Sequence, residues 1–267
     1  MTSPNITHDA VAPLTPLAGY IGGKRSLAKL LIPKIDATPH TLYCEAFVGL
    51  GGIFLRRKHR AKVEAINDYA SDVATLFRVV QHHPQALIDD LRWGLASREA
   101  FGRLVRTDPA QLTDVQRAAR FIQLQSMGFG GKVASRVFGI ASERCAKFNP
   151  QKLMASITAL HARLAGVYVE HLPWREFIER WDRPGALFYL DPPYYGVEGY
   201  YGPIFKRSEF EQLSSTLKEL KGRFILSLND HPEVRRIFAW AKIEEAALTY
   251  CCSGKPTAAR EMIITAP

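Results

Sequence analysis

The tetrad Asp191-Pro192-Pro193-Tyr194 combines residue types that suit a chemical site. It directly follows Ala186–Leu190, an apolar run typical of a buried parallel strand. Proline fixes φ and restricts the residue before it, so we expect a stiff loop. The carboxylate and the carbonyls of this loop accept hydrogen bonds, and the tyrosine offers a flat face. These groups suit a flat heterocycle that carries an amino group, although Asp-Pro-Pro is also a common turn.

A second group of interest is the stretch Tyr20-Ile21-Gly22-Gly23-Lys24, which precedes a predicted helix ending at about Ile32. Backbone N–H groups at a glycine-rich helix start bind anions, and the lysine adds positive charge. The stretch lacks the spacing and the preceding strand of a P-loop, which argues against a nucleotide kinase or ATPase. A site for the carboxylate of an amino-acid-like group is the other interpretation.

The elements around these groups predict an open α/β sheet. Thr41–Val48 is apolar and β-prone, and glycines interrupt it before helix-like residues begin at Ile53. A second strand is expected at Lys62–Asn67 and is followed directly by Asp68. Ala70–His82 has helical periodicity. An acid about 20 residues beyond the glycine turn binds a ribose hydroxyl in nucleotide-binding α/β folds. The alternative role of Asp68 is to cap the next helix.

The middle of the chain differs in character. From residue 84 to about 150, helical patterns dominate up to Met127 and are followed by a glycine-rich, basic stretch, which predicts a mostly helical insertion with a mobile, positively charged loop. Sheet character returns at Val167–Leu172. We expect the remaining strands at Ala186–Leu190, Phe224–Leu228, Ile243–Thr249 and Glu261–Thr265, the last two as an antiparallel hairpin at one edge, and a helix at Leu213–Leu220.

Composition limits the function classes. The 267 residues carry a net charge of +9, with basic clusters at 56–60, 132–147 and 206–207, which suits a polyanion partner or a solvated basic surface. No apolar run is long enough to span a membrane, and 1–10 does not read as a secretory signal, so a cytoplasmic protein is expected. Four cysteines without metal spacing predict reduced thiols, and no structural metal is expected.

In their order along the chain, these motifs resemble those of Dam-type DNA adenine-N6 methyltransferases, the alpha-ordered group of the D12 class. The resemblance covers most of the chain outside the insertion. Two features depart from the family pattern: Tyr20 stands where tryptophan is frequent, and 125–132 lacks the usual Asn-Arg…Phe-Asn-Gly pattern, so no GATC target is inferred. The matching motifs are Tyr20–Lys24, Phe47-Val48-Gly49-Leu50-Gly51, Asn67-Asp68, Asp191–Tyr194, Ser227–Pro232 and Glu261–Thr265.

The resemblance implies a Rossmann-like sheet that binds S-adenosylmethionine, with a catalytic domain formed by 1–83 and 151–267 and a target-recognition insertion at 84–150. Lys24 and the backbone of Gly22 and Gly23 would hold the methionine carboxylate of the cofactor. Asp68 would bind the ribose. The remaining implied cofactor contacts are Tyr20 near the sulfonium, the strand floor of Glu45, Phe47 and Gly49, and Asp191 between cofactor and target.

The chemistry implied for the tetrad is methyl transfer to an adenine flipped out of double-stranded DNA. Asp191 and the carbonyl of Pro192 would accept hydrogen bonds from N6, and Tyr194 would stack on the base, with Pro193 stiffening the loop. The proposed DNA contacts are Lys132, Arg136 and Arg144, and tyrosines 195, 200 and 201 either line the entrance or lie on the surface. Alternatives are methylation of cytosine N4 or of RNA, a catalytically silent DNA-binding module, and a generic nucleotide-binding protein.

Overall fold

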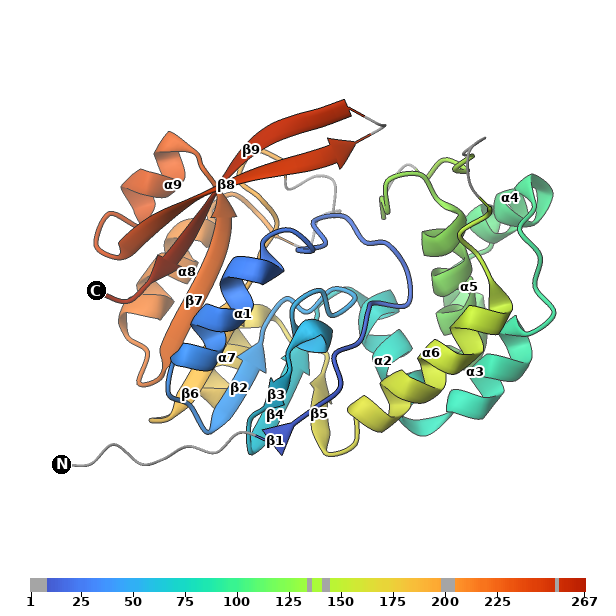
Figure 1. Cartoon of the computed structure of the whole chain (residues 1–267), viewed down its shortest axis with the longest axis horizontal. Coiled ribbons are helices and arrows are strands. Elements are labelled where there is room, and N and C mark those ends of the chain that lie inside the picture. Colours follow the sequence, from blue (N-terminus) through green and yellow to red (C-terminus); the bar gives the residue numbers. More distant parts are fainter. Residues whose placement is uncertain (1–8, 134–135, 141–144, 198–204, 253–254) are drawn as a thin grey trace.

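The computed structural model describes residues 9–133, 136–140, 145–197, 205–252 and 255–267. Its centre is a seven-stranded sheet in the order β5-β4-β2-β6-β7-β9-β8 (Figure 1). The strands β5, β4, β2, β6 and β7 are parallel, and β9 runs antiparallel to both β7 and β8. Their bounds are β2 Leu42–Glu45, β4 Val63–Asn67, β5 Val167–Glu170, β6 Ala186–Leu190, β7 Arg223–Asn229, β8 Lys242–Cys252 and β9 Lys255–Thr265.

This topology confirms the predicted α/β fold. From β2 the chain moves outward to β4 and β5, and then returns to place β6 on the other side of β2. Open parallel sheets bind ligands at such a reversal, in the crevice outside the carboxyl ends of the strands. The glycine turn follows β2 and the tetrad follows β6, so the fold brings both to this crevice.

Alternate side chains of the central strands pack into two separate cores. Tyr43 and Tyr189 belong to the first core, which includes helices α1 (Ala28–Ala37) and α2 (Ser71–His82). Cys44 and Phe188 belong to the second core, formed with α7 (Trp174–Trp181), α8 (Glu209–Lys218) and α9 (Pro232–Ile237). Because side chains alternate along a strand, these strands are buried on both sides, which explains the uninterrupted apolar runs of the sequence.

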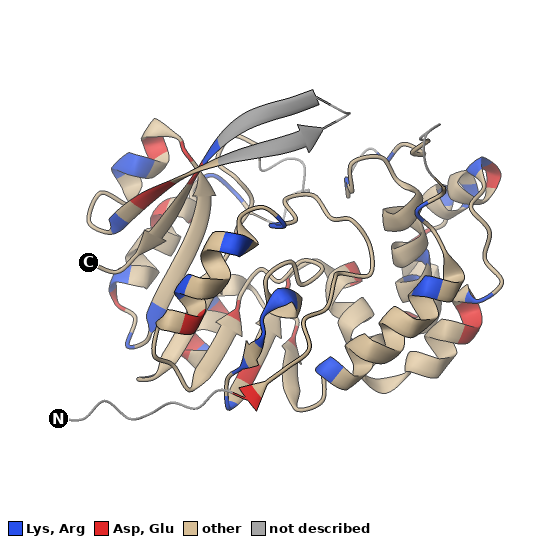
Figure 2. Ribbon diagram, viewed as in Figure 1, with Lys and Arg blue, Asp and Glu red and all other residues tan. Residues whose placement is uncertain are grey.

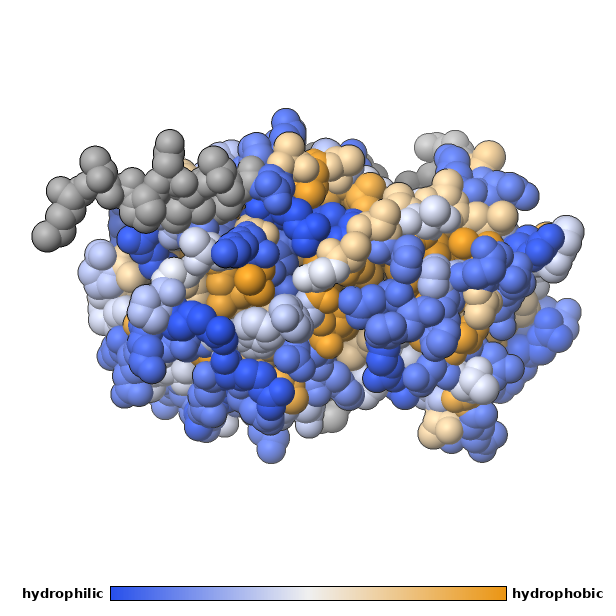
Figure 3. Space-filling model, turned by 90° about the horizontal axis from the view of Figure 1, so that it is seen from below, coloured by the Kyte–Doolittle hydropathy of each residue, from blue (hydrophilic) through white to orange (hydrophobic). Residues whose placement is uncertain are grey.

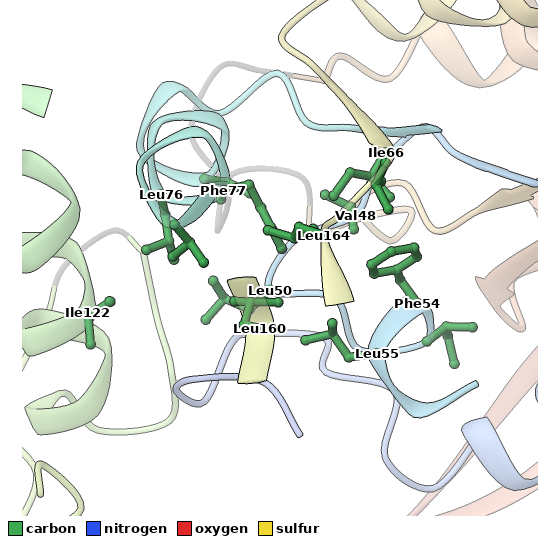
Figure 4. Packing of buried hydrophobic residues seen from close by; sticks show 14 of the residues in the cluster. Val48, Leu50, Phe54, Leu55, Ile66, Leu76, Phe77, Ile122, Leu160 and Leu164 are labelled. Atoms are coloured by element: carbon green, nitrogen blue, oxygen red, sulfur yellow. The ribbon is translucent and has the colours of Figure 1, made fainter. Parts of the chain in front are cut away.

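The predicted insertion is helical up to Met127. It contains α3 (Pro84–Leu91), α4 (Arg98–Arg106), the 3₁₀ turn Pro109–Gln111 and α5 (Asp114–Met127), and α6 (Pro150–Arg163) comes after it. A capping box between Thr113 and Gln116 starts α5. This helix packs on α2 and α3, and its buried residues join the first core. Figure 4 shows Ile66 of β4, Phe77 of α2 and Leu160 of α6 in that core.

Several local predictions were wrong in extent. The helix expected at Leu213–Leu220 is α8, which begins at Glu209 and ends at Lys218. The helix expected from Ile53 is only a 3₁₀ turn, Phe54–Arg56, because the chain must enter β3 (His59–Arg60) and β4 a few residues later. The first helix does not stop near Ile32 but continues through Pro33 to Ala37, since Leu31 and Ile35 are both buried in the core. The strand β3 pairs with β1 (Asp9–Ala10) in a small second sheet that the sequence pattern did not reveal.

The surface seen in Figure 3 is mostly hydrophilic, with apolar residues gathered in smaller patches toward its middle. Lys and Arg residues are spread over the sheet region and the helices alike (Figure 2). Among the described residues, no helix has the length and apolar character needed to cross a membrane.

Candidate functional site

A cavity of about 580 Å³ opens at the carboxyl ends of β2, β4 and β6. This volume lies in the range of about 300–1,000 Å³ that is usual for small-molecule sites. The cavity brings together most of the predicted site residues from three parts of the sequence. Its lining includes Tyr20, Gly22, Gly23 and Lys24, then Glu45, Phe47, Gly49 and Asp68, and finally Asp191 and Pro193.

Lys24 connects the N-terminal glycine turn to the tetrad. Its ammonium group is buried and lies 2.8 Å from Oδ1 of Asp191. It also donates to the hydroxyl of Tyr194 at 2.6 Å and to the carbonyl of Gly22 at 3.3 Å. The ammonium lies 4.3 Å from the centre of the Tyr194 ring. The lysine therefore fixes the positions of both the carboxylate and the aromatic ring of the tetrad.

Asp191 receives a second hydrogen bond from β7. The hydroxyl of Ser227 donates to Oδ1 at 3.0 Å and lies 2.8 Å from the hydroxyl of Tyr189. Among the described residues, none donates a hydrogen bond to Oδ2 of Asp191. Burial raises the pKa of Asp191 to about 6, although Lys24 acts in the opposite direction. Asp191 thus offers an acceptor atom at the cavity and titrates close to neutral pH.

The loop after the tetrad is held by Asn229 at the end of β7. Its side-chain oxygen accepts from the Tyr195 N–H at 2.9 Å, and its amide donates to the Tyr195 carbonyl at 3.0 Å. The Tyr195 ring packs against Phe210 and His231, so this tyrosine supports the loop. Tyr200 and Tyr201, considered for the cavity entrance, lie outside the described residues.

Asp68 joins the glycine turn to the start of α2. Its Oδ2 accepts from the Gly49 N–H at 2.8 Å and its Oδ1 from the Ala70 N–H at 2.9 Å. Both oxygens keep a lone pair, and the residue lines the cavity. Burial raises the pKa of Asp68 to about 6. The N-cap of α2 is Ala70 and no side chain caps this helix, so Asp68 holds the turn before α2 rather than capping it, and its remaining lone pairs leave it able to bind a ligand.

The floor of the cavity is formed by the end of β2 and the turn after it. The hydroxyl of Tyr43 donates to the buried carboxylate of Glu45 at 2.6 Å, and burial raises the pKa of Glu45 to about 8. Gly49 has φ +52°, and a Cβ there would lie 3.1 Å from the Tyr20 ring. The turn needs glycine for its conformation and for this close approach.

The glycine-rich loop after α5 rests directly on the N-terminal motif. The Gly131 carbonyl accepts from the Ile21 N–H at 3.0 Å and from the Gln125 side chain at 3.2 Å. A Cβ on Gly131 would lie 3.0 Å from backbone atoms of Gly19 and Tyr20. The predicted insertion is thus in contact with the wall of the cavity. Nothing in the sequence pattern pointed to this contact.

The predicted DNA contacts have different environments. Lys132 is exposed. Arg136 is half-buried, with its guanidinium 6.0 Å from the centre of the Phe121 ring, and burial lowers its pKa. Arg144 lies outside the described residues.

Within the basic run 56–60, Arg57 is not available to a polyanion. It is fully buried and donates to Oε1 of Glu64 at 2.9 Å, and Arg163 binds both oxygens of the same carboxylate. The apolar character of the strand around Glu64 could have indicated that its charge needed buried partners. The polyanion interpretation is therefore wrong for Arg57.

Comparisons with known proteins agree with the motif order. The family model described as D12 class N6 adenine-specific DNA methyltransferase matches residues 20–250. Remote similarity to solved structures is also found. A Pyrococcus horikoshii protein named as an RNA methyltransferase has 10% identity and a TM-score of 0.42, with 91% of this chain and 82% of that chain covered.

An Escherichia coli protein, YhhF, which is named as a methyltransferase, has 11% identity, a TM-score of 0.40 and coverage of 95% of this chain and 91% of that chain. The precorrin 8W decarboxylase of Methanobacterium thermoautotrophicum has 9% identity and a TM-score of 0.38, with 100% of this chain and 96% of that chain covered. The family model spans every motif from the Gly-Gly-Lys turn through the tetrad to β7. This chain belongs to the D12 class of N6 adenine-specific DNA methyltransferases, which transfer a methyl group from S-adenosylmethionine to N6 of adenine in DNA.

Proposed function

We propose that the chain acts on specific sites in double-stranded DNA and that Asp191, held by Lys24 and Ser227, orients the adenine amino group. The observation that carries the proposal is the hydrogen bonding of this carboxylate. Oδ1 is occupied by Lys24 and Ser227, whereas Oδ2 accepts from no described residue and belongs to a cavity-lining side chain. One carboxylate oxygen thus fixes the side chain, and the other is available to a substrate.

The tetrad supplies what adenine N6 requires. The lone pair of this nitrogen is delocalised into the ring, so the nitrogen is a poor nucleophile. Hydrogen bonds from N6 to Oδ2 of Asp191 and to the Pro192 carbonyl favour a pyramidal nitrogen. The lone pair of this nitrogen is then directed at the methyl group to be transferred. Both acceptors also stabilise the positive charge that develops on N6, at the place where it develops. The bound cofactor supplies an electrophilic methyl group on its sulfonium.

The cavity suits that cofactor. Its volume of about 580 Å³ accommodates a ligand of nucleoside size with an amino-acid chain. Asp68 has lone pairs for ribose hydroxyls, and Gly49 lets the ring of Tyr20, which also lines the cavity, lie close to the turn. Glu45 and Phe47 form the floor. The turn Gly22-Gly23-Lys24 borders the methionine part, and the Tyr20 ring offers a face for a cation–π contact with the sulfonium.

Base flipping connects the cavity to DNA. Extrusion of a base from a duplex costs a few kcal/mol, and stacking on an aromatic ring returns about 1–3 kcal/mol. Tyr194 is the proposed platform, because its hydroxyl is held by Lys24 at 2.6 Å and its ring position is thereby set. Residues 84–150 are proposed as the target-recognition region, with Lys132, Arg136 and Arg144 as DNA contacts. An enzyme of this kind acts where the DNA is, on the nucleoid in the cytoplasm.

The test is transfer of a labelled methyl group to duplex DNA by the Asp191→Asn variant, followed by nucleoside analysis. We expect N6-methyladenine from the wild type and a loss of about 100-fold or more in kcat for the variant, because Lys24 and Ser227 retain the amide oxygen and an NH2 donor then replaces the acceptor Oδ2. Because this variant leaves the buried Lys24 without its counterion, we expect some loss of thermal stability, so kcat is compared at a temperature at which both proteins are folded. Asp89→Asn, an exposed carboxylate that pairs with Arg92, is the matched control. Full activity of Asp191→Asn would contradict the proposal.

A further inference from the structure

The ammonium group of Lys24 has no hydrogen left for another ligand. A lysine ammonium donates three hydrogens. In the structure it has three acceptors, namely Oδ1 of Asp191, the hydroxyl of Tyr194 and the carbonyl of Gly22. Its charge is also compensated by the carboxylate of Asp191. An anionic ligand that approached Lys24 would have to break a contact that holds the tetrad.

Two other cations line the same cavity, Arg25 and Arg56. Arg56 is half-buried, and its guanidinium donates to the carbonyl of Gly52. Among the described residues, no acidic side chain forms an ion pair with either arginine. Since a guanidinium has five N–H donors, Arg56 retains donors for a ligand. Burial, and next the charge of Arg25, lower the pKa of Arg56, and the negative charge of an anion in the cavity would offset both effects.

The position of Arg56 identifies which part of a ligand it would meet. Gly52, which holds the guanidinium, also borders the Gly-Gly-Lys turn. A Cβ on Gly52 would lie 3.4 Å from the Lys24 backbone nitrogen and 3.9 Å from Nη1 of Arg56. The guanidinium therefore lies beside the turn that borders the methionine part of the proposed cofactor.

We propose that Arg56, with Arg25 beside it, binds the α-carboxylate of S-adenosylmethionine, while Lys24 serves the tetrad. The inference rests on the proposed cofactor site and refines it. A planar guanidinium pairs with a carboxylate through two parallel hydrogen bonds, a geometry that the single ammonium of lysine does not provide. A DNA phosphate is the other anion that could occupy the same donors, so the test must separate the two.

The experiment compares two ligands that differ only in the carboxylate, S-adenosylmethionine and decarboxylated S-adenosylmethionine. Their affinities are measured by calorimetry without DNA for the wild type, Arg56→Met and Arg56→Lys. In Arg56→Met we expect the affinity for S-adenosylmethionine to fall about 10- to 100-fold and that for the decarboxylated ligand to stay unchanged, because only a charged hydrogen-bonded pair is lost. Arg56→Lys should lose less. Arg78→Met, which replaces an exposed arginine paired with Asp114, is the control.

The opposite outcomes are distinct. Equal loss for both ligands would show that Arg56 only shapes the cavity, and the proposal would be wrong. Unchanged cofactor affinity with weaker binding of a DNA duplex would assign the arginine to phosphate. If Lys24→Met, and not Arg56→Met, lost affinity for S-adenosylmethionine relative to the decarboxylated ligand, Lys24 would be the residue that binds the carboxylate, and the proposal would be wrong. If the wild type binds neither ligand, the proposed cofactor site itself fails.

Discussion

The ammonium group of Lys24 lies 2.8 Å from Oδ1 of Asp191 and joins the glycine turn before α1 to the loop after β6. In the proposed site, the methyl donor and the methyl acceptor meet between these two segments. Because the same lysine also holds the Tyr194 hydroxyl, the proposed cofactor side of the cavity and the proposed platform for the base are parts of one hydrogen-bonded unit. A substitution on the cofactor side should therefore have a measurable effect on the platform for the base, and a substitution in the platform should affect the cofactor side.

The pH dependence of the reaction should reflect Asp191. Burial raises the pKa of this carboxyl to about 6, so the acceptor form predominates above that pH and disappears below it. At saturating cofactor and DNA, we expect kcat to rise about tenfold per pH unit below 6 and to level off near 7. Asp68 has a similar pKa, but it should affect cofactor affinity and hence kcat/KM. A flat kcat between pH 5 and about 8 would argue against the role of Asp191.

Substitution of Lys24 should move this pH profile. The lysine lowers the pKa of Asp191, so Lys24→Met should raise that pKa. The acid limb of the kcat profile, where kcat falls as the pH is lowered, should then move to a pH that is higher by about one unit or more. Lys24→Arg keeps the charge and should shift the limb less. The measurement is kcat against pH for the three proteins. An unmoved limb in Lys24→Met would mean that the ion pair does not persist in the ternary complex.

Asn229 should matter for catalysis without touching a substrate. Both of its hydrogen bonds hold the Tyr195 backbone, and Asn229→Ala removes them together. We expect kcat to fall about 10- to 100-fold because the tetrad is then less well aligned, with little change in cofactor affinity. Asn149→Ala, which removes the N-cap of α6, should cost about 1 kcal/mol of stability and leave kcat near that of the wild type. Equal kcat values for the two variants would contradict this role.

Gly131 offers a test of the contact between the glycine-rich loop and the cavity wall. Gly130 and Gly131 both have positive φ, 70° and 68°. A Cβ on Gly131 would meet the backbone of Gly19 and Tyr20 at 3.0 Å, whereas a Cβ on Gly130 would meet nothing within 4 Å. Gly131→Ala should therefore weaken cofactor binding in calorimetry, and Gly130→Ala, with the same backbone strain, should not. Equal effects of the two substitutions would assign the loss to strain alone.

The stability of the fold should depend on Glu64. Its carboxylate is fully buried between Arg57 and Arg163. Glu64→Gln leaves two buried guanidinium groups without their counterion, and we expect the free energy of unfolding to fall by about 3–5 kcal/mol. Glu176→Gln, which breaks an exposed pair with Arg180, should cost about 0–1 kcal/mol. Urea denaturation of both variants measures the difference, and similar midpoints would show that the buried network contributes little.

Local patterns were sufficient to predict most strands and helices and the polar residues at their ends. Ala186–Leu190 forms β6 as predicted, and Lys62–Asn67 contains β4, because a strand buried on both faces must be largely apolar. The periodicity of 70–82 predicted α2, and Val73, Leu76, Phe77 and Val80 are indeed buried. Since the motifs occur in family order, the residues alone also indicated the reaction, which the family match confirms.

The sequence by itself thus determined the strands of the seven-stranded sheet, the polar residues at their ends and the family. Only the tertiary structure decided which of those residues meet. Lys24 with Asp191, Ser227 with the same carboxylate, Asn229 with Tyr195 and Gly131 with Tyr20 are contacts between segments far apart in the chain. The contacts of Ser227 and Asn229 depend on the strand order, which places β6 beside β7, whereas Lys24 and Gly131 lie in loops next to α1 and α5 and are positioned by how these helices pack. A local pattern shows that a strand is followed by a carboxylate, but the cation beside that carboxylate comes from a distant turn and is set by the tertiary packing.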